Sequence, residues 1–388
     1  NAPLPGPVPM KDAPRPRIVL INKAYPPWIG GIERHVRDMG EALVRRGWPV
    51  AALVCNSGWY ETREIQNGVR IIRAPQWAWL YSQPIVTRFF SSLHELRPDL
   101  LHVHVPFPLG WWAARAVPDA VPVVCTWHSD IVRQWWLRPL YSHFEQRFLR
   151  RCSAVLVTSE TVLLQSRALR RHREKCRVIP LAVPPDPGVN ETRVLETAER
   201  FRAAAGQPGV LFVGRLVGYK GLPYLIDAMK AIPAALWIAG DGPLREKLQR
   251  QAVRARPGGG IRFWGTVSEE DKAALYEAAA VLVLPSISRN EAFGYVLLEA
   301  MERGCPVITT DLPTGVRNVN EDGVSGLVVP PRDPRALSEA IRRILQEDLR
   351  AKLSEGARQR ARDRFNFEEA AGRLEAVYHA CLNQKPPA

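Results

Sequence analysis

Pro184-Pro-Asp-Pro-Gly-Val-Asn190 is the stretch of sequence that decides how this chain is organised. It holds too much proline and glycine for the interior of a helix or strand, because proline lacks a backbone donor and glycine is conformationally free. Apolar runs of strand length alternate with helical segments on both sides of it. We therefore interpret 184–190 as a linker, and a chain of 388 residues is long enough for two domains.

The N-terminal side of the linker starts with a short buried-strand pattern, Arg17-Ile-Val-Leu-Ile-Asn22, which runs into a loop containing Gly30 and Gly31. Apolar residues at helical spacing predict a helix over 32–43. Further strands are predicted at 49–55, 69–73, 100–105, 121–126, 153–158 and 176–183. This alternation is typical of a doubly wound parallel sheet.

The same alternation restarts after the linker. Strands are predicted at 210–214, 235–239, 261–264, 280–284, 306–310 and 326–329, and helices near 221–230, 243–255, 268–279, 294–303 and 334–346. The sequence thus predicts an α/β protein of two Rossmann-like domains, 17–190 and 191–365, with a ligand cleft where the carboxyl ends of the strands face each other. The proline-rich residues 1–16 lack the apolar core of a signal peptide and are interpreted as a disordered tail or a remnant of cloning.

Composition and charge limit the possible functions. Hydrophobic residues make up 46% and charged residues 24% of the chain, which is typical of a globular protein. The net charge is +14, and residues 1–190 hold 25 Lys and Arg against 14 Asp and Glu. An N-terminal half with this excess of positive charge can bind nucleic acid, an anionic membrane or a phosphorylated substrate. The six cysteines show no metal-site or disulfide spacing, and no apolar run has the length of a membrane span, so a cytoplasmic protein is expected.

The sharpest functional signal is Glu291-Ala-Phe-Gly-Tyr-Val-Leu-Leu-Glu299, which follows a predicted strand. The spacing is slightly more than two helical turns, so both carboxylates can face one side if Glu291 lies just ahead of the helix. The first N–H groups of that helix, on Phe293, Gly294 and Tyr295, would then form an anion site. The alternative is that Glu291 caps the helix and Glu299 is a solvated surface residue.

A second signal is Phe212-Val-Gly-Arg-Leu-Val-Gly-Tyr-Lys-Gly221, where a predicted strand enters a glycine-containing loop. Arg215 and Lys220 suit a diphosphate, because arginine grips oxygens as a fork and lysine acts as a mobile point charge. The loop lacks the ending of a Walker motif. The alternative is a basic turn that only decorates the surface.

Three weaker signals lie at other predicted strand ends. His128, in Thr126-Trp-His-Ser-Asp130, could contact a sugar hydroxyl, although a lone histidine is often a core residue. The pair Gly30-Gly31 lets the backbone approach a phosphate or an acceptor closely. Gly240-Asp-Gly-Pro243 is interpreted as a turn and nothing more.

Taken together and in this order, these segments resemble the retaining glycosyltransferases of family 4, which have the GT-B fold. Gly-Gly-Ile-Glu-Arg-His35, Val-Ile-Pro-Leu181 and Ile-Ala-Gly-Asp-Gly-Pro243 add to the motifs above, and the resemblance runs from about Arg17 to Arg364. Where many relatives continue Pro-Leu-Gly-Val-Asp, this chain reads Pro180-Leu-Ala-Val-Pro184, so details of the hinge are not carried over.

The resemblance implies a site for a nucleotide-sugar donor. Arg215 and Lys220 would hold the diphosphate, Glu299 the ribose, and Glu291 and His128 the sugar, so that the catalytic set is Glu291, His128, Arg215 and Lys220. The donor-binding residues it implies are Gly30, Gly31, Arg215, Lys220, Glu291, Ala292, Phe293, Gly294, Tyr295 and Glu299. Residues 366–388 would form a helix that crosses back to the first domain.

The resemblance also implies retention of the anomeric configuration, by same-face attack in which the leaving phosphate takes the acceptor proton. No DxD pair stands at a predicted strand end, so no metal and no other cofactor is expected, and positive side chains with a helix terminus would neutralise the leaving group.

Thr-Trp-His-Ser-Asp-Ile-Val132 and Arg-Asn-Glu-Ala-Phe-Gly294 are most similar to the bacterial branch that transfers mannose from GDP-mannose to lipid-linked oligosaccharides of surface polysaccharides. A UDP-hexose is the alternative donor. Tryptophan favours the lipid interface, so the basic first domain is predicted to bind the inner face of an anionic membrane peripherally. The tryptophans concerned are Trp77, Trp79, Trp111, Trp112, Trp135 and Trp136, and a dense basic stretch follows at 167–177. The alternative is that the tryptophans are core and the arginines merely solvated.

Two hypotheses from other classes compete with this one. A nucleic-acid-binding protein would use the basic domain but leaves the glutamate pair and the diphosphate loop without purpose, so no nucleic-acid partner is predicted. A non-catalytic sugar-nucleotide sensor would have no need of both glutamates.

Overall fold

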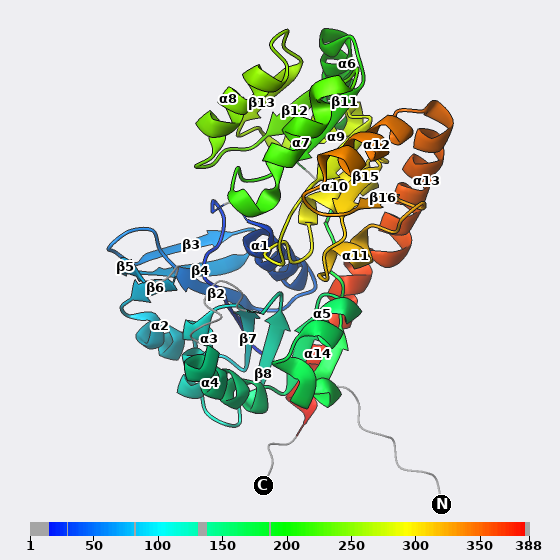
Figure 1. Cartoon of the computed structure of the whole chain (residues 1–388). Helices are drawn as coiled ribbons and strands as arrows, with labels where there is room; N and C mark the ends of the chain where they lie inside the picture. The colour runs from blue at the N-terminus through cyan, green and yellow to red at the C-terminus, as the bar shows by residue number, and fades with distance from the viewer. Residues whose placement is uncertain (1–14, 29, 81–82, 131–137, 186–187, 385–388) are drawn as a thin grey trace, which may run out of the picture. The chain divides into compact units, whose positions relative to one another are not determined.

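The computed structural model describes residues 15–28, 30–80, 83–130, 138–185 and 188–384, which form two compact units (Figure 1). The first comprises the chain up to Cys125, Arg150–Ala154 and the chain from Glu375 onward. The second comprises Thr126–Leu149 and Val155–Leu374. The predicted boundary at residue 190 stays a prediction, and residues 1–14 of the predicted tail lie outside the described part of the chain.

One sheet has eight strands in the order β10-β9-β8-β7-β1-β2-β4-β3. Its strands are β1 (Ile18–Ile21), β2 (Val50–Cys55), β3 (Thr62–Gln66), β4 (Val69–Ala74), β7 (Leu100–Val105), β8 (Val123–Trp127), β9 (Ala154–Val157) and β10 (Cys176–Val178). β1 lies parallel between β2 and β7, and all its residues are buried, as expected of a central strand covered on both faces. β3 pairs antiparallel with β4 at the edge.

The helices of this part of the chain are α1 (Gly31–Arg45), α2 (Phe89–Leu96), α3 (Pro108–Ala116), α4 (Arg138–Arg151) and α5 (Glu160–Gln165), followed by the short 3₁₀ turns η2 (Leu169–Arg171) and η3 (Arg173–Lys175). β5 (Gln76–Leu80) and β6 (Gln83–Val86) form a separate antiparallel pair.

The second sheet has six parallel strands in the order β13-β12-β11-β14-β15-β16. They are β11 (Gly209–Val213), β12 (Ala235–Ala239), β13 (Ile261–Gly265), β14 (Val281–Leu284), β15 (Val307–Thr310) and β16 (Gly326–Val329). Successive strands move outward from β11 in one direction and from β14 in the other. The strand order therefore reverses between β11 and β14, and such a switch point is where open α/β sheets bind ligands.

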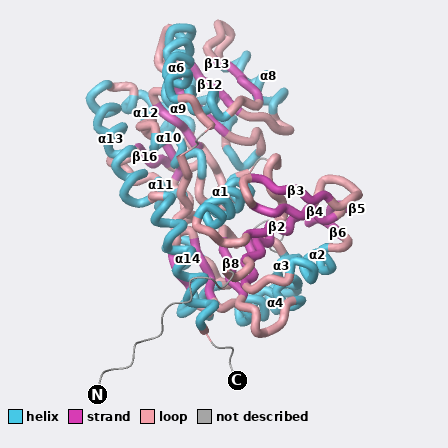
Figure 2. The backbone as a smooth tube through the Cα atoms, turned by 180° about the vertical axis from the view of Figure 1, so that it is seen from behind, coloured by secondary structure: helices cyan, strands magenta, loops and turns pink. Residues whose placement is uncertain are grey.

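Helices alternate with these strands (Figure 2). They are α6 (Glu191–Ala205), α7 (Leu222–Ala228), α8 (Arg245–Ala255), α9 (Glu269–Ala278), α10 (Tyr295–Glu302), α11 (Val316–Val319), α12 (Pro334–Ile344) and α13 (Glu347–Arg364), with 3₁₀ turns η4 (Gly218–Lys220) and η5 (Met229–Ala231). The side chains of Asn190, Ser268 and Asp333 cap α6, α9 and α12 by accepting backbone N–H groups. The final helix, α14 (Phe367–Asn383), starts in the second unit and ends in the first.

The α/β class with parallel sheets confirms the sequence prediction, and the strands predicted between 210 and 329 form within one residue of their predicted ends. The strand predicted over 176–183 was too long. β10 ends at Val178, and Pro180 and Pro184 cannot donate to a sheet ladder.

Candidate functional site

The two strands at the switch point of the second sheet are each followed by a loop that carries predicted site residues. Beyond β11 the chain enters the loop 214–221, and beyond β14 it enters the loop 285–294. Because β11 and β14 pair in parallel, both loops leave the same edge of the sheet next to each other. The switch point therefore gathers the cationic loop and the glutamate motif in one place.

Glycine allows these two loops to pack closely. Gly221 has a φ of +72°, and a Cβ atom at that position would lie 1.9 Å from the carbonyl oxygen of Pro285. The N–H of Ile287 donates to the carbonyl oxygen of Tyr219 at 2.8 Å, which joins the loops directly. A side chain at position 221 would separate them.

Lys220 and Glu291 meet at the centre of this arrangement. Lys220 Nζ lies 2.6 Å from Glu291 Oε2, and the two side chains are only 10% and 8% exposed. The hydroxyl of Ser286 donates to the same carboxylate oxygen at 2.8 Å. Burial lowers the pKa of Lys220, but the charge of Glu291 outweighs it and the net pKa is raised, so the ammonium stays protonated.

The pair leaves bonding capacity for a ligand. Within the described residues, Glu291 Oε1 has no hydrogen-bond partner, so it can accept from a hydroxyl group. An ammonium has three donors, of which Glu291 takes one. Arg215 lies close enough for its charge to lower the pKa of Lys220, and its side chain is exposed. The two loops together thus offer two cations and a carboxylate oxygen to a ligand.

The turn 240–243 has a larger role than its sequence indicated, because it packs against the cationic loop. The N–H of Leu216 donates to the carbonyl oxygen of Asp241 at 2.9 Å, and the N–H of Leu244 donates to the carbonyl oxygen of Leu216 at 3.1 Å. A Cβ atom at Gly240 would lie 2.1 Å from the carbonyl oxygen of Gly214. The turn therefore holds the backbone beside Arg215 in shape.

The glutamate motif spans the start of α10 as predicted. Glu291 lies in the loop, Gly294 caps the helix with a φ of +82°, and the helix begins at Tyr295. Phe293 is buried, and the Tyr295 hydroxyl donates to the carbonyl oxygen of Ala182 at 3.0 Å. The N-terminus of α10 is thereby fixed at the switch point.

Glu299 lies on α10 and is held by two residues of α9. The hydroxyl of Tyr276 donates to Glu299 Oε2 at 2.6 Å, and Lys272 Nζ donates to Oε1 at 3.2 Å. Sequence reasoning missed both residues. Their spacing of four places them on one face of α9, but the sequence does not reveal which helix that face contacts.

His128 follows β8 and lines a pocket of about 210 Å³ in the second unit. The side chain is buried, and Ala292 lines the same pocket, so the structure brings together two residues predicted to contact the donor. Gly30 and Gly31 lie at the start of α1 in the first unit. Gly30 has an extended backbone with a φ of −173°, which any residue can adopt.

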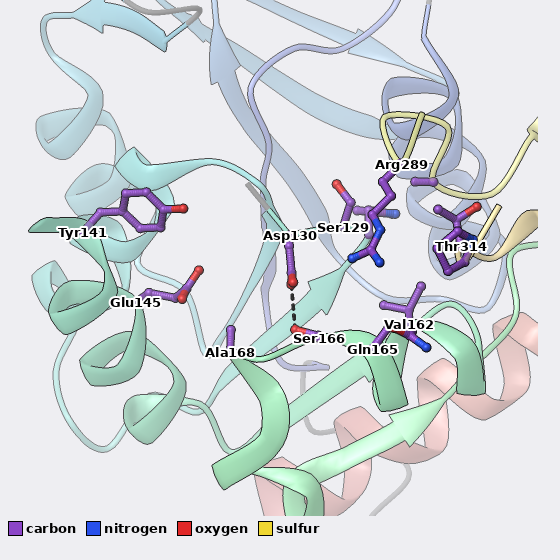
Figure 3. A pocket seen from close by; sticks show the side chains of 13 residues that line it. Ser129, Asp130, Tyr141, Glu145, Val162, Gln165, Ser166, Ala168, Arg289 and Thr314 are labelled. Atoms are coloured by element: carbon purple, nitrogen blue, oxygen red, sulfur yellow. Dashed lines mark hydrogen bonds between the residues drawn. The ribbon is translucent and has the colours of Figure 1, made fainter. Parts of the chain in front are cut away.

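The rest of this pocket is lined by residues that were not predicted as site residues, although Ser129, Asp130 and Arg289 lie in the motifs quoted above (Figure 3). Tyr141 and Glu145 of α4 lie at one end, and Arg289 lies toward the other. Between them the Ser166 hydroxyl donates to Asp130 Oδ1 at 2.6 Å, and the same oxygen accepts from the indole of Trp127. The pocket thus carries hydroxyl, carboxylate and guanidinium groups suited to a polar ligand.

The predicted membrane surface needs one correction. Trp111 is 5% exposed and belongs to the core, because α3 turns it inward, whereas Trp77 and Trp112 are 59% and 45% exposed. Trp135 and Trp136 lie outside the described residues, as does the side chain of Trp79. Among the described helices, none has both the length and the apolarity needed to cross a bilayer.

Comparison with known proteins places this geometry in a family. Residues 29–187 match the family described as Glycosyltransferase Family 4, and residues 196–360 match Glycosyl transferases group 1. The O-antigen chain mannosyltransferase C of Escherichia coli is 31% identical over 95% of this chain and 100% of its own length. The D-rhamnosyltransferase WbpZ of Pseudomonas aeruginosa is 32% identical over 90% of this chain and 92% of its own.

Solved structures show the same fold. Sucrose-phosphate synthase from Thermosynechococcus elongatus superposes with a TM-score of 0.77 at 26% identity, covering 94% of this chain and 99% of that one. WaaG, a glycosyltransferase involved in lipopolysaccharide biosynthesis, gives a TM-score of 0.70 at 20% identity over 93% and 99% of the two chains. This chain is therefore a GT-B glycosyltransferase and belongs to glycosyltransferase family 4.

Proposed function

We propose that this glycosyltransferase is a retaining, metal-independent hexosyltransferase that moves mannose from GDP-mannose to a lipid-linked saccharide in surface polysaccharide synthesis. The observation that carries the proposal is the buried Lys220–Glu291 pair, set beside the N-terminus of α10 at the switch point of the second sheet. The name of one relative, an O-antigen chain mannosyltransferase, supports the choice of mannose and of a surface polysaccharide.

The cations would act on the leaving group. As the bond between sugar and diphosphate breaks, the anomeric carbon gains positive charge and the phosphate gains negative charge. Arg215, the two remaining donors of Lys220 and the positive N-terminal end of α10 would stabilise that phosphate without a metal.

Glu291 would position the sugar and take no covalent part. Its Oε2 is engaged by Lys220 and Ser286, which stabilises the negative charge and makes it a poor nucleophile. Its Oε1 would accept a sugar hydroxyl, and Glu299 would bind the ribose. The acceptor hydroxyl would attack the anomeric carbon from the face that the phosphate leaves, and a phosphate oxygen would take the proton of that hydroxyl. The product would then retain the anomeric configuration of the donor.

The donor is tested by incubating the full chain with GDP-mannose or UDP-glucose, a lipid-diphosphate saccharide and EDTA. We expect transfer from GDP-mannose in EDTA and a product that NMR shows to have the anomeric configuration of the donor. Preferential transfer from UDP-glucose would assign the alternative donor, and an absolute need for Mg²⁺ or Mn²⁺, or an inverted product, would contradict the mechanism.

We further propose that the chain works peripherally at the inner face of the membrane. Trp59 and Trp77 are 74% and 59% exposed, and their ring centroids lie 5.8 Å apart, so they form an aromatic patch on the first unit. Each Lys or Arg near an anionic surface adds about 1 kcal/mol, and the attraction is screened by salt. The basic first half of the chain supports such binding.

This proposal is tested by sedimentation of the full chain with phosphatidylglycerol vesicles. We expect binding at low salt, release as salt rises, and weaker binding of the double variant W59A/W77A. A matched control is Y224F, a change within the second unit. Equal binding to neutral vesicles would contradict the electrostatic part, and absence of binding to both would exclude the membrane role.

A further inference from the structure

A second pocket, of about 480 Å³, lies at the N-terminal ends of strands of the second sheet, whereas the donor loops follow the carboxyl ends. Gly209 is the first residue of β11, and Ala280 and Pro306 directly precede β14 and β15, so the pocket lies where these strands begin. Arg215 and Glu291 lie beyond the ends of the same strands. At about 3.3 Å per residue, the strands separate the two sites by more than 10 Å.

The lining of this pocket is strongly basic. Four arginines and one glutamate contribute to it: Arg202, Arg303, Arg350, Arg358 and Glu277. Arg202 pairs with Glu277 at 3.8 Å. Arg303 makes a bidentate pair with Glu191, with nitrogen to oxygen distances of 2.9 and 3.1 Å. These two arginines are therefore neutralised.

Arg350 and Arg358 are the other two, and they come from one face of α13. They lie four residues before and after Ser354, which also lines the pocket, so the three side chains form a row along the helix. Across the described part of the chain, no carboxylate lies within ion-pair distance of either guanidinium. The pocket thus holds two uncompensated positive charges.

Arg358 is held in place before any ligand arrives. Its Nη2 donates to the carbonyl oxygen of Arg303 at 3.3 Å. Gly304 has a φ of +70°, and a Cβ atom there would lie 2.3 Å from Arg358 Cζ, so the guanidinium packs directly on the glycine backbone. A fixed guanidinium loses less entropy when it binds an anion.

Capping of helix ends explains only part of this cluster. Arg202 donates to the carbonyl oxygen of Glu277 near the end of α9, and Arg358 donates to that of Arg303 at the end of α10. Both contacts complement the negative ends of helices. Arg350 has no such carbonyl among its contacts within the described residues, and Arg358 uses one of its five N–H groups in this way.

We propose that this pocket binds a phosphate-bearing small molecule, with the phosphate between Arg350 and Arg358 and a hydrogen bond from Ser354. Guanidinium groups match the paired oxygens of a phosphate, and the hydroxyl adds a further donor. The volume exceeds that of a phosphate alone, and the amide of Gln207 offers polar contacts for the remainder of the ligand. Tyr276 also lines the pocket while its hydroxyl binds Glu299, so an occupant would touch the support of the donor site.

The proposal is tested by calorimetric titration of the full chain with inorganic pyrophosphate. The titration uses the R215Q variant, in which the donor site is weakened, and compares it with R215Q/R350Q and R215Q/S354A. We expect R215Q to retain a pyrophosphate site. Loss of a charge-assisted contact should weaken that site about ten-fold or more in R215Q/R350Q and less in R215Q/S354A.

The matched control is R215Q/R343Q, because Arg343 is an exposed arginine of α12 outside the pocket. It should bind pyrophosphate as R215Q does. Thermal unfolding of each variant checks that the fold is kept. Absence of pyrophosphate binding in R215Q, or equal affinity in R215Q and R215Q/R350Q, would overturn the proposal.

Discussion

The ammonium of Lys220 and the carboxylate of Glu291 lie 2.6 Å apart in a place where each side chain is at least nine-tenths buried. Charges so placed interact strongly, but each also loses its hydration, so the pair is retained for what it does and adds little to stability. Here the pair fixes the orientation of the Glu291 side chain and keeps the two remaining N–H donors of Lys220 beside the carboxylate.

Removing one partner of this pair should therefore be costly. K220M leaves the Glu291 carboxylate buried without its cation, and we expect it to lower the free energy of unfolding by about 3 to 5 kcal/mol. The double variant K220M/E291L should recover most of that stability, but not activity. Urea unfolding of the single and double variants measures both effects.

The control is K230M, which breaks the exposed pair between Lys230 and Asp227. Exposed pairs contribute about 1 kcal/mol or less, so K230M should unfold almost as the wild type does. If K220M is no more destabilising than K230M, the pair is not buried in solution as described.

Residue types at strand ends could be predicted from the sequence, but their partners could not. Arg215, Lys220 and the two glutamates were selected because their chemistry suits a diphosphate and a sugar, and the structure places Lys220 on Glu291. Their roles toward a ligand stay predictions. Tyr276 escaped notice because a tyrosine in an apolar helix pattern is indistinguishable from a core residue until its neighbour is known.

At the scale of elements, the turn 240–243 shows how a glycine outside the cationic loop can shape the site. The φ of Gly240 is +126°, and its Cα faces the carbonyl oxygen of Gly214. G240A should strain the backbone and displace the loop of Arg215. We expect a loss of about 2 kcal/mol or more in stability and weaker nucleotide binding.

Gly218 provides the comparison, since it lies in the same loop region and a Cβ atom there would meet nothing within 4 Å. G218A should change stability by less than about 1 kcal/mol. Thermal unfolding and nucleotide titration of both variants separate the two positions. Equal behaviour of G240A and G218A would show that the turn does not brace the loop.

Helix α9 is expected to act on the donor through Tyr276, which positions Glu299. Y276F removes one hydrogen bond to the carboxylate, worth about 1 kcal/mol, so we expect nucleotide affinity to fall several-fold. Because the change acts on binding, KM should rise more than kcat falls. The control is Y224F, a partly buried tyrosine of α7, and unchanged nucleotide affinity in Y276F would exclude this positioning role.

Helices and strands with a plain apolar pattern were predictable from the sequence, and several without one were not. β11, β12, β14 and β15 are fully buried parallel strands and stand out as apolar runs. β3 reads Thr-Arg-Glu-Ile-Gln, with an alternation hidden by charged residues that protect a sheet edge. β5, β6, α6 and α13 were missed as well, α13 because its sequence is mostly charged.

At the scale of the whole molecule, buried histidines in the first unit should make the chain sensitive to acid. Burial lowers the pKa of His35 to about 4 and that of His102 to about 3, while an unfolded histidine titrates near 6.5. As pH falls from about 6.5 toward 4, the unfolded chain binds protons that the folded chain does not, so stability falls.

For His35, the lowered pKa corresponds to a loss of at most roughly 3 kcal/mol in the free energy of unfolding by pH 4. Chemical denaturation between pH 7.5 and 5 should show the loss, and H35Q should lessen the slope with pH. H94Q, which changes an exposed histidine, should leave the slope as in the wild type. Identical slopes in all three proteins would mean that His35 is not buried and neutral.

The central claim is that the switch point of the second sheet binds the donor, with Glu299 on the nucleotide and Glu291 on the sugar. The most direct test is a GDP titration in EDTA of the wild type, E299Q and E291Q, paired with turnover of each. We predict metal-independent binding that weakens about ten-fold or more in E299Q but less than three-fold in E291Q, with E291Q losing the more turnover. Equal affinities and equal turnover in the two variants, or GDP binding that requires a divalent metal, would contradict the account.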